Sequence, residues 1–395
     1  MAKKINVLAE LLKCALFDYE IDEHVKKTIS ENAVTIYNMA LHHDLAHLVG
    51  YALVKSGIVV EDVNLADEFL KQQAMAVMRY ENQRDALEKI KVLFESEKIP
   101  FVPLKGAVIR DLYPEPWMRT SCDIDVLVHE EDIEKAKKAL VENLGFVCDP
   151  QHCYHDISLF LGEDVHLELH FSIKETMDNI DMLLEKVWEH ARPIAEGAFE
   201  HVLSDEFLVF QHVAHMSYHF VGGGCGIRGY VDLFLLNKYL DVDREKLDKM
   251  LSDCGIKKFY DLSVRLSDVW FADAEHDDVT YLMHCYILEG GVYGKKDTSI
   301  AVRRMKKDRF SYVFGRIFLP FRQLVITYPK LGEKPALMPF YQIKRWCRIV
   351  FAGKTKRSIN ELKTGVNVTA EKIDYLTELF EKTGLINNSE EKRSL

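Results

Sequence analysis

Two aspartates, Asp123 and Asp125, are separated by one residue in the segment Asp123-Ile-Asp-Val-Leu-Val128. The alternation of acidic and apolar residues predicts a strand, in which residues i and i+2 point to the same side of the sheet. Two carboxylates held side by side repel each other, and a divalent cation such as Mg²⁺ relieves this repulsion through oxygen ligands. The pair therefore suggests a metal site, although a solvated surface strand can carry the same pattern.

A second polar face follows in Val165-His-Leu-Glu-Leu-His170, where His166, Glu168 and His170 alternate with apolar residues. If this strand lies beside the first one, Glu168 completes a cluster of three carboxylates, which can hold two ions for in-line displacement at phosphorus. A transition-metal site built from both histidines and Glu168 is another interpretation. An ordinary strand with one solvated face is the third.

Lys105 and Gly106 lie farther upstream, where an extended run ends and a helix is predicted to begin. The N-terminus of a helix favours phosphate because of its free N–H groups and its positive dipole end. Gly106 lets the backbone approach a phosphate closely, and Lys105 adds a positive charge. Arg119 is a further candidate for nucleotide binding, but it is equally suited to pairing with one of the two aspartates.

Later helical segments supply candidates for the wall of a cleft. His212 and His215 are three residues apart in an apolar stretch, which is typical of core histidines, and His215 is a candidate cleft residue together with His170. Arg228 is also a cleft candidate. It lies four residues before Asp232, however, and we favour a simple ion pair between them on one helix.

The elements that must position these residues fall into three parts. Apolar residues recur at helical spacing over residues 1–95, strands and one helix alternate in the next hundred residues, and helices dominate again from residue 206. The strands are expected at residues 123–128, 146–148, 154–161 and 165–171, with a helix at 130–144. This order predicts an α+β protein with an N-terminal helical region (1–95), a catalytic core (96–195) and a C-terminal helical domain (196–395).

The composition is that of a globular protein, with 48% hydrophobic residues. No apolar run reaches the roughly 20 residues that a membrane-spanning helix needs. Charged residues Glu10 and Lys13 interrupt the first apolar stretch, so it does not resemble a signal peptide. We therefore expect a cytoplasmic protein without a membrane partner. The eight cysteines form no CxxC pair, which argues against a disulfide framework or a structural zinc site.

The net charge of −11 is unevenly distributed. Residues 295–357 contain 17 Lys and Arg and only three acidic residues. This basic stretch is a solvated helical face, a platform for an anionic acceptor such as RNA, or a contact for an acidic partner. We favour the solvated face, because Phe340, Trp346 and Phe351 recur at helical spacing and are expected to face the core.

Taken in order, these segments resemble an uncharacterised bacterial nucleotidyltransferase family within the polymerase-β superfamily. The resemblance is most specific over residues 99–171, and weaker similarities extend over most of the chain. The segments that carry it are Pro103–Gly106, Leu112–Pro114, Arg119–Val128, Gly145–Phe146 and Glu168–His170.

The resemblance implies a nucleotidyltransferase fold, with a mixed sheet, flanking helices and helical regions on both sides in sequence. It also implies that Asp123 and Asp125 bind Mg²⁺ or Mn²⁺, with Glu168 as a third ligand or as the base for the attacking hydroxyl. Gly106 and the following helix would hold the triphosphate of an NTP, with ATP as the expected nucleotide. The acceptor hydroxyl would belong to a small molecule, a protein side chain or tRNA, bound on the C-terminal helical domain.

One feature departs from the superfamily pattern. The phosphate loop has Gly106-Ala107 where a Gly-Gly or Gly-Ser pair is usual, so the serine hydroxyl is missing and Lys105 would have to replace it. Three hypotheses follow: an active nucleotidyltransferase, a catalytically silent nucleotide-binding member that acts as sensor or scaffold, and a His/Glu transition-metal-binding protein of another class.

Overall fold

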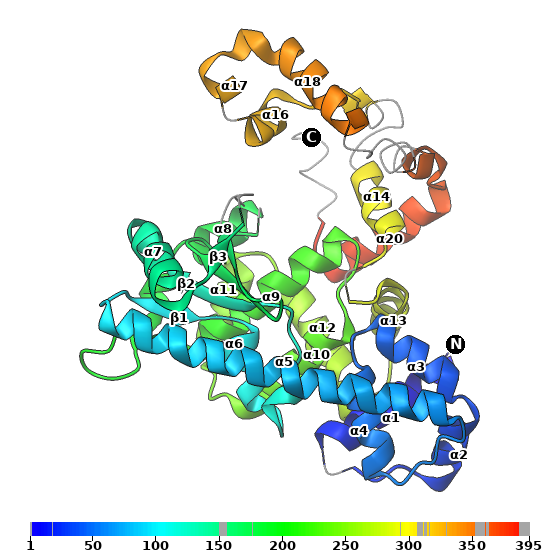
Figure 1. Cartoon of the computed structure of the whole chain (residues 1–395). Coiled ribbons are helices and arrows are strands. Elements are labelled where there is room, and N and C mark those ends of the chain that lie inside the picture. The colour runs from blue at the N-terminus through cyan, green and yellow to red at the C-terminus, as the bar shows by residue number, and fades with distance from the viewer. Residues whose placement is uncertain are drawn as a thin grey trace. The chain divides into compact units, whose positions relative to one another are not determined.

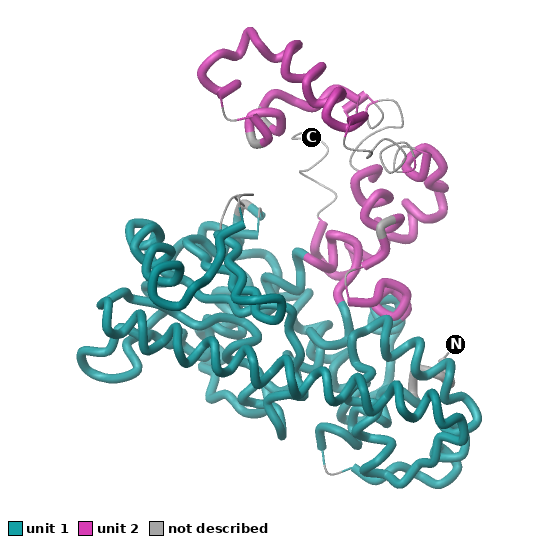
Figure 2. The backbone as a smooth tube through the Cα atoms, in the orientation of Figure 1, with its two compact units in different colours: residues 1–218, 226–284 teal, residues 219–225, 285–395 magenta. Residues whose placement is uncertain are grey.

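The computed structural model forms two compact units (Figure 2): residues 1–218 with 226–284, and residues 219–225 with 285–395. The division into an N-terminal helical region, a catalytic core and a C-terminal helical domain, with boundaries at residues 95 and 195, stays a prediction. The residues that the structure describes are 2–17, 19–149, 156–175, 177–292, 294–305, 311, 314–315, 317–328, 330–351, 360 and 363–386.

The first unit contains a five-stranded sheet with the strand order β1-β2-β5-β4-β3. β2 and β5 pair in parallel, and the other neighbouring strands are antiparallel. β4 and β5 form the hairpin expected at residues 162–164. The strands are β1 (Phe101–Pro103), β2 (Ile124–Val128), β3 (Val147–Cys148), β4 (Asp156–Leu161) and β5 (Val165–His170). The mixed sheet and its flanking helices confirm the predicted fold class.

The apolar face of this sheet packs against helices α5 (Val63–Ser96) and α7 (Ile133–Leu144), as Figure 1 illustrates. Val126, Leu167 and Leu169 are buried in this core. Because side chains alternate along a strand, the acidic residues of β2 and β5 point to the opposite face. The core therefore fixes which side of the sheet carries the polar groups.

Helices precede and follow the strands in the sequence, as expected. Among the described residues, four helices precede α5. Asp62 caps the N-terminus of α5 by accepting hydrogen bonds from the backbone N–H groups of Asn64 and Leu65. A short second sheet of β6 (Ala191–Pro193) and β7 (His201–Leu203) was not predicted. The other helices that contribute to the first unit are α1 (Ala2–Leu16), α2 (Glu23–Glu31), α3 (Ala33–His42), α4 (Ala46–Lys55), α6 (Gly106–Ile109), α8 (Asp178–Leu184), α9 (Asp205–Gly222), α10 (Ile227–Tyr239), α11 (Arg244–Asp253), α12 (Lys257–Phe271) and α13 (Asp278–Gly290). The last residues of α9 and α13 belong to the second unit.

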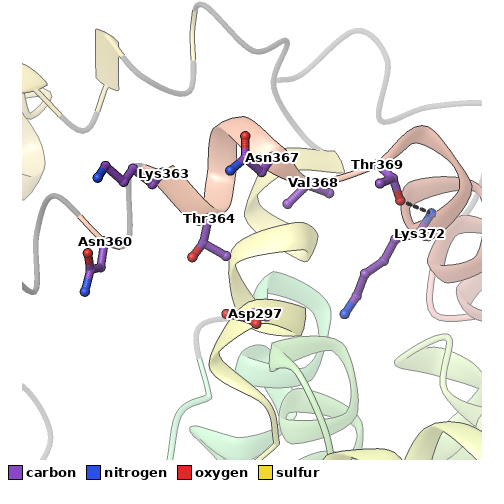
Figure 3. Close-up of a pocket in the computed structure, with 8 residues that line it drawn as sticks. All are labelled: Asp297, Asn360, Lys363, Thr364, Asn367, Val368, Thr369 and Lys372. Atoms are coloured by element: carbon purple, nitrogen blue, oxygen red, sulfur yellow. Dashed lines mark hydrogen bonds between the residues drawn. The ribbon is translucent and has the colours of Figure 1, made fainter.

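The second unit is helical and has its own core. The rings of Phe220, Tyr286 and Phe380 pack together, with centroids 4.8 to 6.1 Å apart. A pocket in this unit is lined by residues such as Asp297, Lys363 and Lys372 (Figure 3), and none of the candidate site residues lines it. Its helices include α14 (Lys296–Met305), α16 (Phe321–Thr327), α17 (Lys330–Glu333), α18 (Met338–Phe351) and α20 (Ala370–Thr383).

The expectation that the aromatic residues of α18 face the core is wrong. Phe340, Trp346 and Phe351 are 59%, 43% and 87% exposed. Helical spacing shows that residues share one face of a helix, but it does not show that another element covers that face. Among the helices of the described residues, none is both long and apolar enough to cross a membrane.

The sheet core should set the stability of the first unit. Leu167 is fully buried, so Leu167→Ala should lower the free energy of unfolding by about 2–5 kcal/mol. Urea unfolding followed by circular dichroism measures this loss. Val147→Ala is the control, because Val147 on edge strand β3 is 67% exposed and should cost far less. Equal losses for both variants would contradict this description of the core.

Candidate active site

The predicted carboxylates meet where β2 and β5 run side by side. The parallel register pairs Asp125 with Glu168, and Asp123 directly precedes β2. Ligand atoms of Asp125, Glu168 and His170 all lie within 4.8 Å of one another, and so do those of Asp123, His166 and Glu168. Glu168 thus belongs to both groups, and its carboxylate lies near those of Asp123 and Asp125.

Asp125 is held by two cationic side chains. Lys105 Nζ lies 2.9 Å from its Oδ1 atom, and His170 Nε2 lies 2.8 Å from the same oxygen. His170 Nε2 is also 3.4 Å from Glu168 Oε2. The Lys105 backbone has φ +46° and ψ −116°, a conformation that costs energy for any residue except glycine. The strained turn directs the lysine side chain to Asp125.

The carboxylates differ in their electrostatic surroundings. Burial raises the pKa of Asp123, and the neighbouring charges of Asp125 and Glu168 raise it further. Burial would also raise the pKa of Asp125, but Lys105 and His170 outweigh this effect and lower it. The hydrogen bond with His170 lowers the pKa of Glu168. Uncompensated negative charge is therefore greatest at Asp123, and an oxygen-binding dication there would relieve it.

His170 responds to the same charges. Burial alone would lower the pKa of this imidazole, but hydrogen bonds with Asp125 and Glu168 raise it to about 9. In the cation-free site, His170 is therefore protonated at neutral pH.

A buried network of hydrogen bonds, which the sequence patterns did not predict, supports the backbone next to Lys105 and the backbone next to Asp123. Arg110 donates to the backbone oxygen of Gly106 at 2.7 Å and to Gln83 Oε1 at 3.0 Å. Gln83 in turn donates to the backbone oxygen of Ser121, whose hydroxyl donates to the backbone oxygen of Asp123 at 2.6 Å. The network fixes the backbone on both sides of the site.

The sequence does contain a signal for part of this network. Phe69, Ala76 and Ile90 lie seven residues apart or at a multiple of seven, and all three are buried on α5. Gln83 falls at the missing position of this series and is also buried. A polar residue in an otherwise apolar seven-residue repeat indicates a buried polar contact, because an unpaired amide would be costly there.

Arg119 does not pair with either candidate metal ligand. Its guanidinium lies 2.9 Å from Asp232 Oδ2, and Tyr113 donates to the other oxygen of Asp232 at 2.7 Å. A methyl group added at Gly106 would lie 2.5 Å from Arg119 Nη1. The guanidinium therefore occupies the space that a side chain at position 106 would need, which explains the glycine there.

The cleft candidates from the later helices have defined partners. Arg228 binds Asp44 Oδ2 at 3.1 Å and the backbone oxygen of Thr120 at 2.9 Å. The expected ion pair between Arg228 and Asp232 is therefore wrong, because each residue pairs with a group distant in sequence. Arg228 instead ties α10 to the segment that leads into Asp123.

His215 is linked to the carboxylate site through Glu175. The Nδ1 atom of His215 is 2.6 Å from Glu175 Oε1. Burial lowers the pKa of Lys105, but the charge of Asp125 outweighs burial, and the charge of Glu175 raises this pKa further. His212 differs, since its Nε2 atom lies 2.8 Å from the backbone oxygen of Gly229 in the interior. Of the two histidines, His215 is thus the one linked to the site.

Comparison with known proteins agrees with this geometry. A family model described as an uncharacterised nucleotidyltransferase matches residues 30–272, which is more than half of the chain. The chain therefore belongs to this nucleotidyltransferase family, and all the candidate site residues lie within the matched segment. No curated protein and no solved structure gives a match.

Replacing one residue of the Arg119–Asp232 pair should lower the free energy of unfolding more than replacing both. Asp232→Leu leaves a buried guanidinium without its carboxylate, which costs about 3–5 kcal/mol of stability. The double variant Arg119→Met/Asp232→Leu removes both charges and should lose less. Urea unfolding of both proteins measures the difference. A double variant that is as unstable as the single one would contradict the argument.

The raised pKa of His170 predicts a pH-dependent stability in the cation-free protein. An unfolded histidine titrates near 6.5, so the stabilisation is complete below about pH 6.5 and is lost as the pH rises through about 9. In EDTA, the difference in melting temperature between wild type and His170→Asn should shrink over this range. His24→Asn, on the exposed surface of α2, is the control. A difference that stays constant with pH would refute the prediction.

Proposed function

We propose that this chain transfers a nucleoside monophosphate from an NTP to an acceptor hydroxyl and releases pyrophosphate, with divalent ions held by Asp123, Asp125 and Glu168. The convergence of the three carboxylates across β2 and β5 carries the proposal. Membership of the nucleotidyltransferase family supports the same class of reaction.

The residues of the cluster fit a hard or borderline dication. Their donor atoms are carboxylate oxygens and imidazole nitrogens, and the raised pKa of Asp123 reflects negative charge that a cation would neutralise. When bound, Mg²⁺ or Mn²⁺ would offset the charge of the reacting phosphates.

The chain itself then has to hold its ligands and the nucleotide. Lys105 and His170 fix Asp125 before any cation arrives. In the nucleotide-bound protein, the Lys105 ammonium would be placed to pair with a phosphate oxygen. The Lys105 side chain is 29% exposed, so it can reach a bound ligand. Gly106 and Arg119 would contribute by maintaining the turn that carries Lys105.

In the proposed reaction, the acceptor oxygen attacks the α-phosphorus and forms a new phosphoester bond. The bond between the α-phosphorus and the bridging oxygen to the β-phosphate breaks, and its electron pair leaves with pyrophosphate. The hydroxyl proton goes to a carboxylate oxygen of the cluster. Positioning and charge neutralisation account for such catalysis, without a covalent intermediate on the protein.

ATP is the expected nucleotide, and the acceptor is a small molecule, a protein side chain or tRNA. His170, His215 and Arg228 are proposed to line or brace the acceptor side of the site. The helical residues that follow the core are proposed to carry the acceptor.

A catalytically silent nucleotide-binding protein is the second candidate function. Two observations favour it: Ala107 replaces the usual glycine or serine of the phosphate loop, and the Arg119 guanidinium covers Gly106. Such a protein would bind an NTP with a divalent cation but would not cleave it.

Label transfer distinguishes the two functions. The protein is incubated in a cell extract with Mg²⁺, Mn²⁺ and NTPs labelled at either the α- or the γ-phosphate. An active nucleotidyltransferase should pass α-label, but not γ-label, to an acceptor. Asp123→Asn, Asp125→Asn and Glu168→Gln should each lower the rate by at least about a hundredfold, since each removes a negatively charged ligand for the divalent ions that offset the charge of the reacting phosphates.

Asp164→Asn, in the exposed turn between β4 and β5, is the matched control and should keep wild-type activity. Circular dichroism verifies that every variant is folded. Wild-type transfer by the Asp125→Asn protein would eliminate the metal assignment. Tight NTP binding without any transfer would favour the silent protein.

A further inference from the structure

The carboxylate cluster contains two histidines that are placed differently. His170 lies with Asp125 and Glu168, whereas His166 lies with Asp123 and Glu168. Each group therefore has two carboxylates and one imidazole, and Glu168 is common to both. This division differs from a single site built from both histidines and Glu168, because the histidines belong to separate groups.

His170 is already engaged through Nε2, which contacts the carboxylates of Asp125 and Glu168. It therefore acts as a positioning residue for these two side chains. His166 Nε2, in contrast, is buried from solvent and has no hydrogen-bond partner among the described residues. Leaving a buried polar atom unpaired costs about 1–3 kcal/mol, so this nitrogen calls for an explanation. One ring nitrogen of His166 lies within 4.8 Å of ligand oxygens of both Asp123 and Glu168.

The His166 ring is also held in a defined orientation. Phe160 on β4 is its direct cross-strand partner, and the two rings stack with centroids 4.6 Å apart and an interplanar angle of 8°. Cross-strand stacking of this kind restricts rotation of the ring. The imidazole is thus preorganised beside Asp123 and Glu168 rather than free to turn toward water.

We propose that Asp123, His166 and Glu168 form a mixed nitrogen–oxygen subsite that selects a first-row transition-metal dication, such as Mn²⁺, over Mg²⁺. The inference rests on the proposed function, in which Asp123 and Glu168 hold an ion. Mg²⁺ prefers oxygen ligands and retains several waters, whereas imidazole nitrogen suits transition metals. His166 would then determine which ion the site takes, with one of its ring nitrogens as a ligand of that ion.

Pulsed electron paramagnetic resonance with Mn²⁺ tests this subsite directly. Full-length protein that is first depleted of metal and then loaded with Mn²⁺ should show hyperfine modulation from a coordinated histidine nitrogen, and isotopic labelling of the histidines should change this modulation. His166→Gln should abolish this modulation, whereas His170→Asn and the surface control His24→Asn should retain it. The isotope experiment uses wild-type protein, so the proposal stays testable even if a variant fails to fold.

Calorimetric titration with each metal alone gives an independent readout. His166→Gln should weaken Mn²⁺ binding by at least about tenfold and change Mg²⁺ binding less, so that the preference for Mn²⁺ shrinks.

Two results would overturn the subsite without affecting the proposed function. The first is bound Mn²⁺ in wild-type protein without any histidine modulation. The second is modulation that survives in His166→Gln but disappears in His170→Asn. Failure of the wild-type protein to bind either metal would instead refute the carboxylate site itself, and with it the proposed function.

Discussion

The parallel pairing of β2 and β5 is the constraint on which the candidate site depends. Because the register sets Asp125 opposite Glu168, the two acidic residues share one face while their apolar neighbours enter the core. A shift of one residue would send a polar side chain into that core. Packing of Val126, Leu167 and Leu169 against α5 and α7 therefore maintains the geometry of the carboxylates, although the apolar side chains lie on the opposite face of the sheet.

Crowding acidic groups on a buried face requires compensation, and the structure provides it unevenly. Asp125 receives a lysine and a histidine, whereas the surroundings of Asp123 raise its pKa. The site thus combines one carboxylate that is already neutralised with one that favours an added cation. The backbone conformation of Lys105 directs its ammonium to Asp125, and the buried network around Arg110 holds the neighbouring backbone in place.

Local sequence patterns predicted four strands of the larger sheet (β2 to β5), the hairpin and the three candidate carboxylates, because alternation along a strand is a short-range property. The sequence patterns did not show whether β2 and β5 are neighbours, and the structure shows that they pair in parallel. Patterns failed where the partner lies far away in sequence. Arg119 and Asp232 are 113 residues apart, and spacing on one helix wrongly assigned Asp232 to Arg228. The aromatic stripe of α18 failed for a related reason, since periodicity carries no information about what covers a face.

The ion pair between Arg119 and Asp232 has a consequence for the evolution of this chain. It links the segment leading into the acidic strand to helix α10, and Arg228 makes a second link from the same helix to the backbone of Thr120. A fragment containing only residues 96–195 would expose a guanidinium that normally lies against a buried carboxylate. The helical residues that follow are thus part of the scaffold of the site, so fusion or recombination events that exchange them should preserve both ties or replace both charges together.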